Sequence, residues 1–313
     1  MRPAERGYFE LEAPAKAGNR YFYIVDDAKP VPDPVSRLLP EGVHGATVAP
    51  PSRPLKYYPA SMRVFITGAS SGLGEGLARH YARAGATIGL CARRASVLSA
   101  VAAAIERDGG RAIVHAGDVS DTAAMEQAAT AFAAECGGVD LVIANAGIGI
   151  PHQTLQGKAE PIAGLMRINV IGVTNTIVPF VPIMIRQGSG TLVAMGSVAG
   201  QRGLPGRAAY SASKAAVATF MDALRLELAG TNVHAMTLCP GFVETPLTAT
   251  LPGKLPFVLK LDEAVAQMTR AIERRERRFL LPWQMRLLGH VLALAPEALV
   301  RRLAPPPRTS APK

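Results

Sequence analysis

Cysteine is scarce in this sequence, which has only Cys91, Cys136 and Cys239 among its 313 residues. Three scattered thiols are too few for a disulfide scaffold, so we expect a reducing, cytoplasmic setting. Neither these thiols nor the six histidines cluster at the spacing of metal ligands, and we expect no metal site. Long apolar runs are also missing: we find no stretch of 18 uncharged apolar residues that predicts a simple membrane-spanning helix, and the first ten residues lack the apolar run of a signal peptide.

Charge is sparse as well, because Asp, Glu, Lys and Arg make up 19% of the chain while hydrophobic residues make up 49%. This composition excludes a mainly disordered chain. The net charge of +10 is unevenly placed: residues 1–61 carry a net +1 and residues 270–313 carry a net +7. No DNA-reading motif accompanies this excess, so we expect no nucleic-acid partner.

Composition divides the chain into three parts. Residues 1–61 hold 10 of the 25 prolines, a density that blocks long helices and central strands but permits short edge strands. Residues 62–282 form the second part, and residues 283–313 are a basic, amphipathic tail. Segments such as 283–303 lie on anionic membranes, or pack on their own domain or a partner subunit, and both interpretations stay open.

From Met62 onward, apolar stretches of strand length alternate with helical stretches. In order they are 64–67, 75–84, 87–91, 95–107, 112–116, 122–135, 141–145, 165–186, 191–195, 210–229, 233–238 and 262–277. Such alternation predicts right-handed crossovers and a parallel sheet covered by helices on both faces. We therefore predict an α/β fold with a doubly wound parallel sheet.

The first predicted strand, 64–67, leads into a glycine-rich loop and then directly into a helix. Glycine permits the tight turn and lets the backbone approach a pyrophosphate. The helix start presents free N–H groups and the positive end of the helix dipole to phosphates. A plain strand–helix turn is the alternative. The residues predicted to bind dinucleotide phosphates are Gly68, Ser70, Ser71, Gly72, Leu73 and Gly74.

The spacing of this loop, Thr-Gly-x-x-x-Gly-x-Gly, resembles that of the short-chain dehydrogenase/reductase family. Further motifs of that family follow in the family's order: Asn145-Ala-Gly147, Asn169, Ser197, Tyr210-x-x-x-Lys214 and Pro240-Gly241. The resemblance covers residues 62 to about 282. It implies one Rossmann-type domain with a seven-stranded parallel sheet, and a homo-oligomer formed through the long helices at 165–186 and 210–229.

Tyr210 and Lys214 lie four residues apart, so a helix places both side chains on one face. The pKa of a free tyrosine is about 10, and we expect the nearby ammonium group, with the charge of an oxidised nicotinamide, to lower it. The resemblance implies that Tyr210 gives a proton to a carbonyl oxygen, that Ser197 orients this carbonyl, and that Lys214 also holds the nicotinamide ribose. It further implies that Asn169 helps to hold a water near Lys214.

The second predicted strand ends in Ala92-Arg93-Arg94, which bears on the choice of cofactor. An NAD enzyme usually has a carboxylate here for the ribose 2′-hydroxyl, and the resemblance places Ala92 at that position. Guanidinium groups suit a 2′-phosphate. We therefore predict that the protein prefers NADP(H) to NAD(H). The alternative is that one of these arginines only caps the end of the strand in solvent.

The resemblance adds further cofactor contacts. Asp118 and Val119 correspond to a pair that contacts adenine, although Asp118 is nearly as well suited to cap a helix. The other implied contacts are Asn145, Ala146, Gly147, Tyr210, Lys214, Pro240, Gly241, Val243 and Thr245.

The stretch 246–260 is apolar and contains two prolines and a glycine, and its position suits a substrate lid. Leu247, Leu251, Leu255 and Phe257 indicate a hydrophobic substrate, with ordinary packing as an equally good interpretation.

Residues 7–47 are similar to a fragment of the N-terminal module of maltooligosyltrehalose trehalohydrolases, on motifs such as Gly7-Tyr-Phe-Glu and Arg20-Tyr-Phe-Tyr. Forty residues are too few for a complete β-sandwich. Our hypothesis is a gene-fusion remnant or an over-extended start, with Met62 opening the functional domain.

The predicted function is NADP(H)-dependent interconversion of a carbonyl and an alcohol on a small, hydrophobic molecule. The first alternative is a non-catalytic NAD(P)-binding sensor on the same fold. The second is a carbohydrate-binding protein that acts through the N-terminal extension.

Overall fold

The computed structural model describes residues 62–149, 156–249, 251, 255–298 and 300, and four short strands nearer the N-terminus. The strands β1 (Arg2–Ala4) and β2 (Tyr8–Glu10) form one antiparallel pair, and β3 (Phe22–Tyr23) and β4 (Val31–Pro32) form another. The chain divides into two compact units, Met1–Pro59 and Ala60–Lys313. The rest of the segment that is similar to the trehalohydrolase module lies outside the described residues.

The second unit is built on a seven-stranded sheet, which confirms the predicted α/β class. The strand order is β11-β10-β9-β8-β5-β6-β7, and every neighbouring pair is parallel. The strands are β5 (Arg63–Thr67), β6 (Thr87–Ala92), β7 (Arg111–Ala116), β8 (Leu141–Ala144), β9 (Gly190–Met195), β10 (Val233–Pro240) and β11 (Arg278–Leu281).

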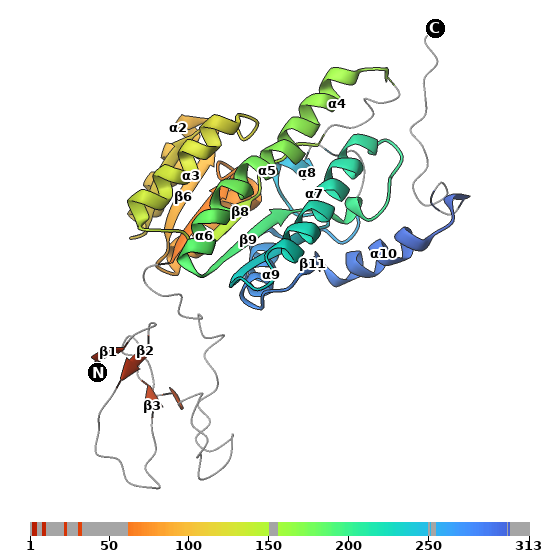
Figure 1. Cartoon of the computed structure of the whole chain (residues 1–313). Coiled ribbons are helices and arrows are strands. Elements are labelled where there is room, and N and C mark those ends of the chain that lie inside the picture. The colour runs from red at the N-terminus through yellow and green to blue at the C-terminus, as the bar shows by residue number, and fades with distance from the viewer. Residues whose placement is uncertain are drawn as a thin grey trace. The chain divides into compact units, whose positions relative to one another are not determined.

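Helices cover both faces of this sheet (Figure 1). Helix α1 (Gly72–Arg83) packs beside α2 (Ala95–Arg107) and α9 (Leu261–Glu273). On the other face lie α3 (Thr122–Cys136), a helical run over 159–187, and α7 (Ala208–Glu227). Because both faces are covered, central strands such as β8 are buried along their whole length. The other described helices are α8 (Pro246–Ala249), α10 (Trp283–Leu294) and the 3₁₀ turn η5 (Val198–Gly200).

The helical run over 159–187 is long and apolar enough to span a membrane by length and composition, with a mean hydropathy of 1.8. The sequence-based expectation of no such segment is wrong, because the 18 residues 168–185 contain no charged side chain. Val173, Ile177, Phe180 and Met184 of this run are buried in the hydrophobic core, so a core helix accounts for its hydropathy. The run comprises α4 (Ala159–Met166), the π-helical turn η3 (Arg167–Ile171), α5 (Gly172–Ile177), the 3₁₀ turn η4 (Val178–Phe180) and α6 (Val181–Gln187).

The chain changes direction between β5 and β8. It runs outward from β5 to β6 and β7, and then returns to place β8 on the other side of β5. Loops leaving the carboxyl ends of these two neighbours diverge, and a crevice opens between them in doubly wound sheets.

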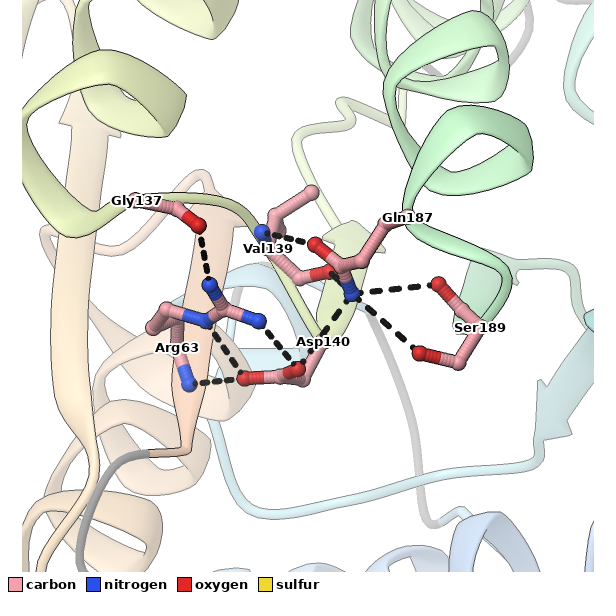
Figure 2. Close-up of polar contacts among 6 residues, drawn as sticks. All are labelled: Arg63, Gly137, Val139, Asp140, Gln187 and Ser189. Atoms are coloured by element: carbon pink, nitrogen blue, oxygen red, sulfur yellow. Dashed lines mark hydrogen bonds and ion pairs between the residues drawn. The ribbon is translucent and has the colours of Figure 1, made fainter.

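A polar network ties β5 to β8 at the opposite edge of the sheet (Figure 2). Arg63 donates to both carboxylate oxygens of Asp140, at 2.8 Å from Nε and 2.7 Å from Nη2, and its backbone N–H donates to the same carboxylate. Gln187, at the end of α6, exchanges two hydrogen bonds with the backbone of Val139. These contacts fix the two central strands that carry the crevice.

Candidate active site

The loop between β5 and α1 is shaped for close approach of backbone. Gly68 (φ +67°) and Gly72 (φ +58°) adopt the left-handed conformation that favours glycine. A Cβ atom added at Gly74 would lie 2.3 Å from the carbonyl oxygen of Gly68, so α1 can pack this near the loop only with glycine there. Helix α1 begins at Gly72, and its first N–H groups are therefore free for an anion at the loop.

Asn145, directly after β8, fastens this loop to the centre of the sheet. Its Nδ2 donates to the carbonyl oxygens of Thr67 (3.0 Å) and Gly68 (3.2 Å). Its backbone N–H donates to Oγ1 of Thr67 at 3.2 Å. The carboxyl ends of β5 and β8 are thereby held together at the crevice.

A cavity of about 280 Å³, here called the first cavity, lies over the glycine loop. It brings together predicted cofactor residues from loops after five strands, β5, β6, β7, β8 and β10. Those that line it are Gly68, Ser70, Ser71, Gly72, Leu73, Arg93, Arg94, Asp118, Val119, Asn145, Ala146, Gly147 and Thr245.

Two guanidinium groups reach the edge of the first cavity beside Ala92. Arg94 donates from Nη2 to Oγ of Ser70 at 3.0 Å, and Nη1 of Arg93 lies 3.8 Å from Oδ2 of Asp118. The helix-capping role considered for Asp118 is wrong, because Asp121 caps α3 by accepting from the backbone N–H of residue 124. Free N–H groups at a helix start and two arginines fit the phosphates of a dinucleotide.

A larger cavity of about 500 Å³, the second cavity, adjoins the first. Leu73, Thr245 and Leu247 line both cavities. Tyr210, the third residue of α7, and Ser197, which follows β9, stand in the wall of the second cavity. The predicted proton donor therefore lies where a bound dinucleotide and a second small molecule would meet.

Lys214 lies behind Tyr210 on the same helix. Its Nζ is 5.7 Å from the centre of the Tyr210 ring and donates to the carbonyl oxygen of Met195 at 2.7 Å. The lysine is 5% exposed, and burial lowers its pKa to about 8. Below about pH 8 the side chain is therefore a buried cation.

The electrostatics of Tyr210 differ from the sequence-based expectation. Burial raises the pKa of this phenol, and hydrogen bonding with Ser197 and the positive charge of Arg207 lower it. Lys214 is not among the groups that lower it: with a pKa of about 8, this amine has already lost its proton at the pH where the phenol ionises. Arg207, one helical turn before Tyr210, supplies the cationic influence instead.

Asn169 lies in the π-helical turn η3 and is fully buried. Its side chain accepts from the backbone N–H of Ile148 (2.8 Å) and donates to the carbonyl oxygen of Ile148 (2.9 Å). It also donates to Oγ of Ser213 (3.2 Å), which in turn donates to the carbonyl oxygen of Tyr210 (2.8 Å). Asn169 therefore links the loop after β8 to the first turn of α7, and its amide is occupied by these contacts.

The second cavity is mostly apolar, and its far wall is helix α10. Met285, Leu288 and Leu292 of α10 line it, so this part of the C-terminal segment packs on its own domain. Leu247, Leu251 and Leu255 of the predicted lid also line the cavity, whereas Phe257 does not and is 50% exposed.

Several predicted cofactor residues take other places. Pro240, Gly241 and Val243 line the second cavity, and Gly74 lies beneath the loop. Sequence reasoning missed Arg202, Arg207 and the α10 residues of the second cavity, and Gly117, Ile148 and Ile168 of the first. Pro246 and Leu247, predicted as part of a substrate lid, also line the first cavity. The position of Arg207, three residues before Tyr210 and directly before α7, was a usable signal. Nothing local to the sequence links Arg202 or α10 to this site.

Comparison with known proteins places these features in a family. Residues 62–255 match the family model described as short chain dehydrogenase. An uncharacterized oxidoreductase of Myxococcus xanthus (strain DK1622) is 38% identical over 242 residues, which is 76% of this chain and 96% of that protein.

Two solved structures share the fold. A short-chain dehydrogenase from Sphingobium yanoikuyae in complex with NADPH superposes with a TM-score of 0.67 at 28% identity, covering 80% of this chain and 98% of that one. A short chain dehydrogenase/reductase from Burkholderia phymatum in complex with NAD gives a TM-score of 0.70 at 24% identity, with the same coverage of both chains.

Proposed function

Because this chain belongs to the short chain dehydrogenase family and its relatives are oxidoreductases, we propose that it interconverts a carbonyl and an alcohol on a hydrophobic molecule with NADP(H). The observation that carries the proposal is the position of Tyr210. It lines the second cavity together with Ser197, and residues of that same lining also line the first cavity. When bound, the reduced nicotinamide supplies a hydride to the carbonyl carbon.

The residues around Tyr210 have separate tasks in this proposal. The Tyr210 hydroxyl gives its proton to the carbonyl oxygen, and the Ser197 hydroxyl stabilises the negative charge that develops there. Lys214 lies behind the phenol and reaches toward the loop after β8: a Cβ atom added at Gly147 would lie 3.6 Å from its Nζ. That position suits a hydrogen bond to a ribose in the first cavity. Asn169 positions the Ile148 backbone and α7.

NADP(H) preference rests on the residues at the end of β6. Arg93 and Arg94 line the first cavity, and Ala92 supplies no carboxylate to bind a ribose 2′-hydroxyl. The nearby carboxylate, Asp118, already accepts from the backbone N–H and the hydroxyl of Ser120. A 2′-phosphate would give Arg94 an anionic partner and Arg93 a second one beside Asp118.

The alternative of a non-catalytic sensor is less well supported. Ser197 and Tyr210 line one cavity, Lys214 Nζ lies 5.7 Å from the centre of the Tyr210 ring, and Asn169 is linked to Tyr210 through Ser213, an arrangement that a binding-only protein does not require. The carbohydrate-binding alternative depends on the N-terminal extension and gains no support from the second unit.

The decisive experiment is Tyr210→Phe. The variant keeps the ring but has no proton to give, so NADPH oxidation with a panel of aldehydes, quinones, steroids and acyl ketones should fall by about 100- to 10,000-fold. NADPH affinity, measured by fluorescence titration, should stay within twofold and exceed the affinity for NADH. Tyr81→Phe, in the core away from both cavities, is the matched control and should retain activity. Full activity of Tyr210→Phe would refute the mechanism.

A homo-oligomer is part of the proposal. Ile171, Val178 and Ile185 recur every seven residues along the run over 159–187 and are 46%, 50% and 45% exposed. Such a stripe on a long helix favours a second copy of the chain as its partner. Analytical ultracentrifugation should give the native protein the mass of an oligomer. The Val178→Asp variant should sediment as a monomer.

The outer side of α10 suits an anionic lipid surface, and we place the protein in the cytoplasm with peripheral membrane contact. Trp283, Leu287, Val291 and Leu294 are 71%, 61%, 48% and 88% exposed. Residues 270–313 carry a net +7, which complements anionic lipid. Co-sedimentation with anionic but not neutral vesicles, reduced by Leu287→Asp, would support this contact, and no co-sedimentation would exclude it.

A further inference from the structure

The second cavity holds an unexpected concentration of positive charge. Among the described residues that line it, the charged side chains are Arg202 and Arg207, and none is Asp or Glu. The rest of the lining is dominated by leucine, methionine, proline and phenylalanine. A cavity built only for a neutral hydrophobic molecule has no use for two guanidinium groups.

Arg207 is the more informative of the two. It immediately precedes α7 and is partly buried, and its guanidinium group makes no hydrogen bond or ion pair with any residue that the structure describes. Arg202 has at least one contact, from Nη1 to the carbonyl oxygen of Ala293 (3.3 Å), which leaves most of its five N–H groups available. A partly desolvated cation without a partner is stabilised when an anion arrives.

The position of Arg207 says where such an anion would lie. Arg207 is the residue directly before α7, three residues ahead of Tyr210, and both residues line the second cavity. The positive charge of Arg207 also lowers the pKa of the Tyr210 phenol, in keeping with their place in one cavity wall. The apolar wall of α10, by contrast, offers only Met285, Leu288 and Leu292.

We propose that the substrate is an amphiphilic oxo-acid, whose carboxylate is bound by Arg207 close to the reacting carbonyl and whose apolar chain extends along α10. A planar carboxylate matches the fork of a guanidinium group and forms two parallel hydrogen bonds with it. This inference rests on the proposed function, because it names the substrate class of the same site. It makes Arg207 a specificity-determining residue.

The kinetic test compares 4-oxodecanoate with its neutral methyl ester. Arg207→Gln should raise KM for the acid by about 10-fold or more, the usual effect of losing hydrogen bonds to a charged group, while KM for the ester stays within twofold. Arg207→Lys should restore part of the preference for the acid. Arg107→Gln, on the exposed side of α2, is the matched control and should leave both values unchanged. An equal rise in KM for the acid and the ester in Arg207→Gln would overturn the proposal.

A binding test separates this inference from the proposed reaction. Isothermal titration of the protein with decanoate and with methyl decanoate requires no turnover. The native protein should bind decanoate at least about 10-fold more tightly, and Arg207→Gln should abolish the difference. Decanoate binding that depends on Arg207, with no reduction of any ketone, would leave the anion site standing and remove the oxidoreductase proposal. Equal binding of acid and ester by the native protein would remove the anion site.

Discussion

Lys214 shows how strongly burial governs a single residue in this site. Its ammonium group is buried with the Met195 carbonyl oxygen as a hydrogen-bond acceptor, and its pKa falls from the ordinary 10.5 to about 8. Between these two values the unfolded chain keeps a proton at this residue and the folded chain releases it. The free energy of unfolding contributed by Lys214 therefore rises with pH across this window, and is lowest below about pH 8.

Replacing Lys214 by methionine should remove this pH dependence. We expect the free energy of unfolding of the native protein, relative to Lys214→Met, to increase by ~2 kcal/mol between about pH 8 and pH 10. Urea denaturation of both proteins across that range measures the difference. Lys260→Met, at an exposed lysine, is the control and should run parallel to the native protein. Parallel curves for Lys214→Met as well would contradict the assigned pKa.

At the scale of elements, the contacts that stabilise the sheet and the residues of the candidate site lie at opposite ends of the strands. The cavities lie at the carboxyl ends of the strands, whereas Arg63 and Asp140 join β5 and β8 at the amino ends. The hydrogen bonds to Asp140 raise the pKa of Arg63, as expected for a guanidinium held by a carboxylate. Both side chains are less than one-third exposed, at 20% and 32%, so water screens this pair less than an ordinary surface pair.

Asp140→Ala should therefore destabilise the protein without changing catalysis. Removing the carboxylate leaves three Arg63 hydrogen bonds without an acceptor, and we expect a loss of ~1–3 kcal/mol in the free energy of unfolding. Urea denaturation and steady-state kinetics test both halves of this statement. The matched control is Glu135→Ala, whose pair with Arg111 is 50% and 63% exposed and should contribute almost nothing. A changed KM for NADPH in Asp140→Ala would argue against the separation.

At the scale of the whole molecule, the candidate site belongs to one of the two compact units. Every described residue of the sheet and of both cavities lies in Ala60–Lys313. Met62, just before β5, accepts a hydrogen bond at its carbonyl oxygen from the backbone N–H of Thr87, and both residues lie within that unit.

A chain that starts at Ala60 should fold and bind NADPH as the full chain does. Its core and site are complete, so we expect the free energy of unfolding to stay within ~0.5 kcal/mol, the range of changes away from structural contacts. Denaturation and fluorescence titration of the two chains give the comparison. Loss of folding on removal of residues 1–59 would show that the extension supports the domain, and would end the hypothesis that the functional domain begins at Met62.

Much of this protein follows from local sequence. Alternating strands and helices gave the parallel sheet, and the glycine spacing after β5 gave the loop over which the first cavity lies, because both depend on residues close together in the chain. The four-residue spacing of Tyr210 and Lys214 likewise placed their side chains together. The hydropathy of the run over 159–187 was less informative, since a buried core helix and a membrane helix have the same composition.

The tertiary structure alone decided the features that depend on distant packing. Arg202 and Ala293 are 91 residues apart in sequence, and only folding brings α10 to the wall of the second cavity. The pKa of Lys214 and the influence of Arg207 on Tyr210 also required the fold, because desolvation and Coulomb interactions depend on what surrounds a group in space. Spacing along the chain identifies chemical groups, whereas their hydration and neighbours decide the charge they carry.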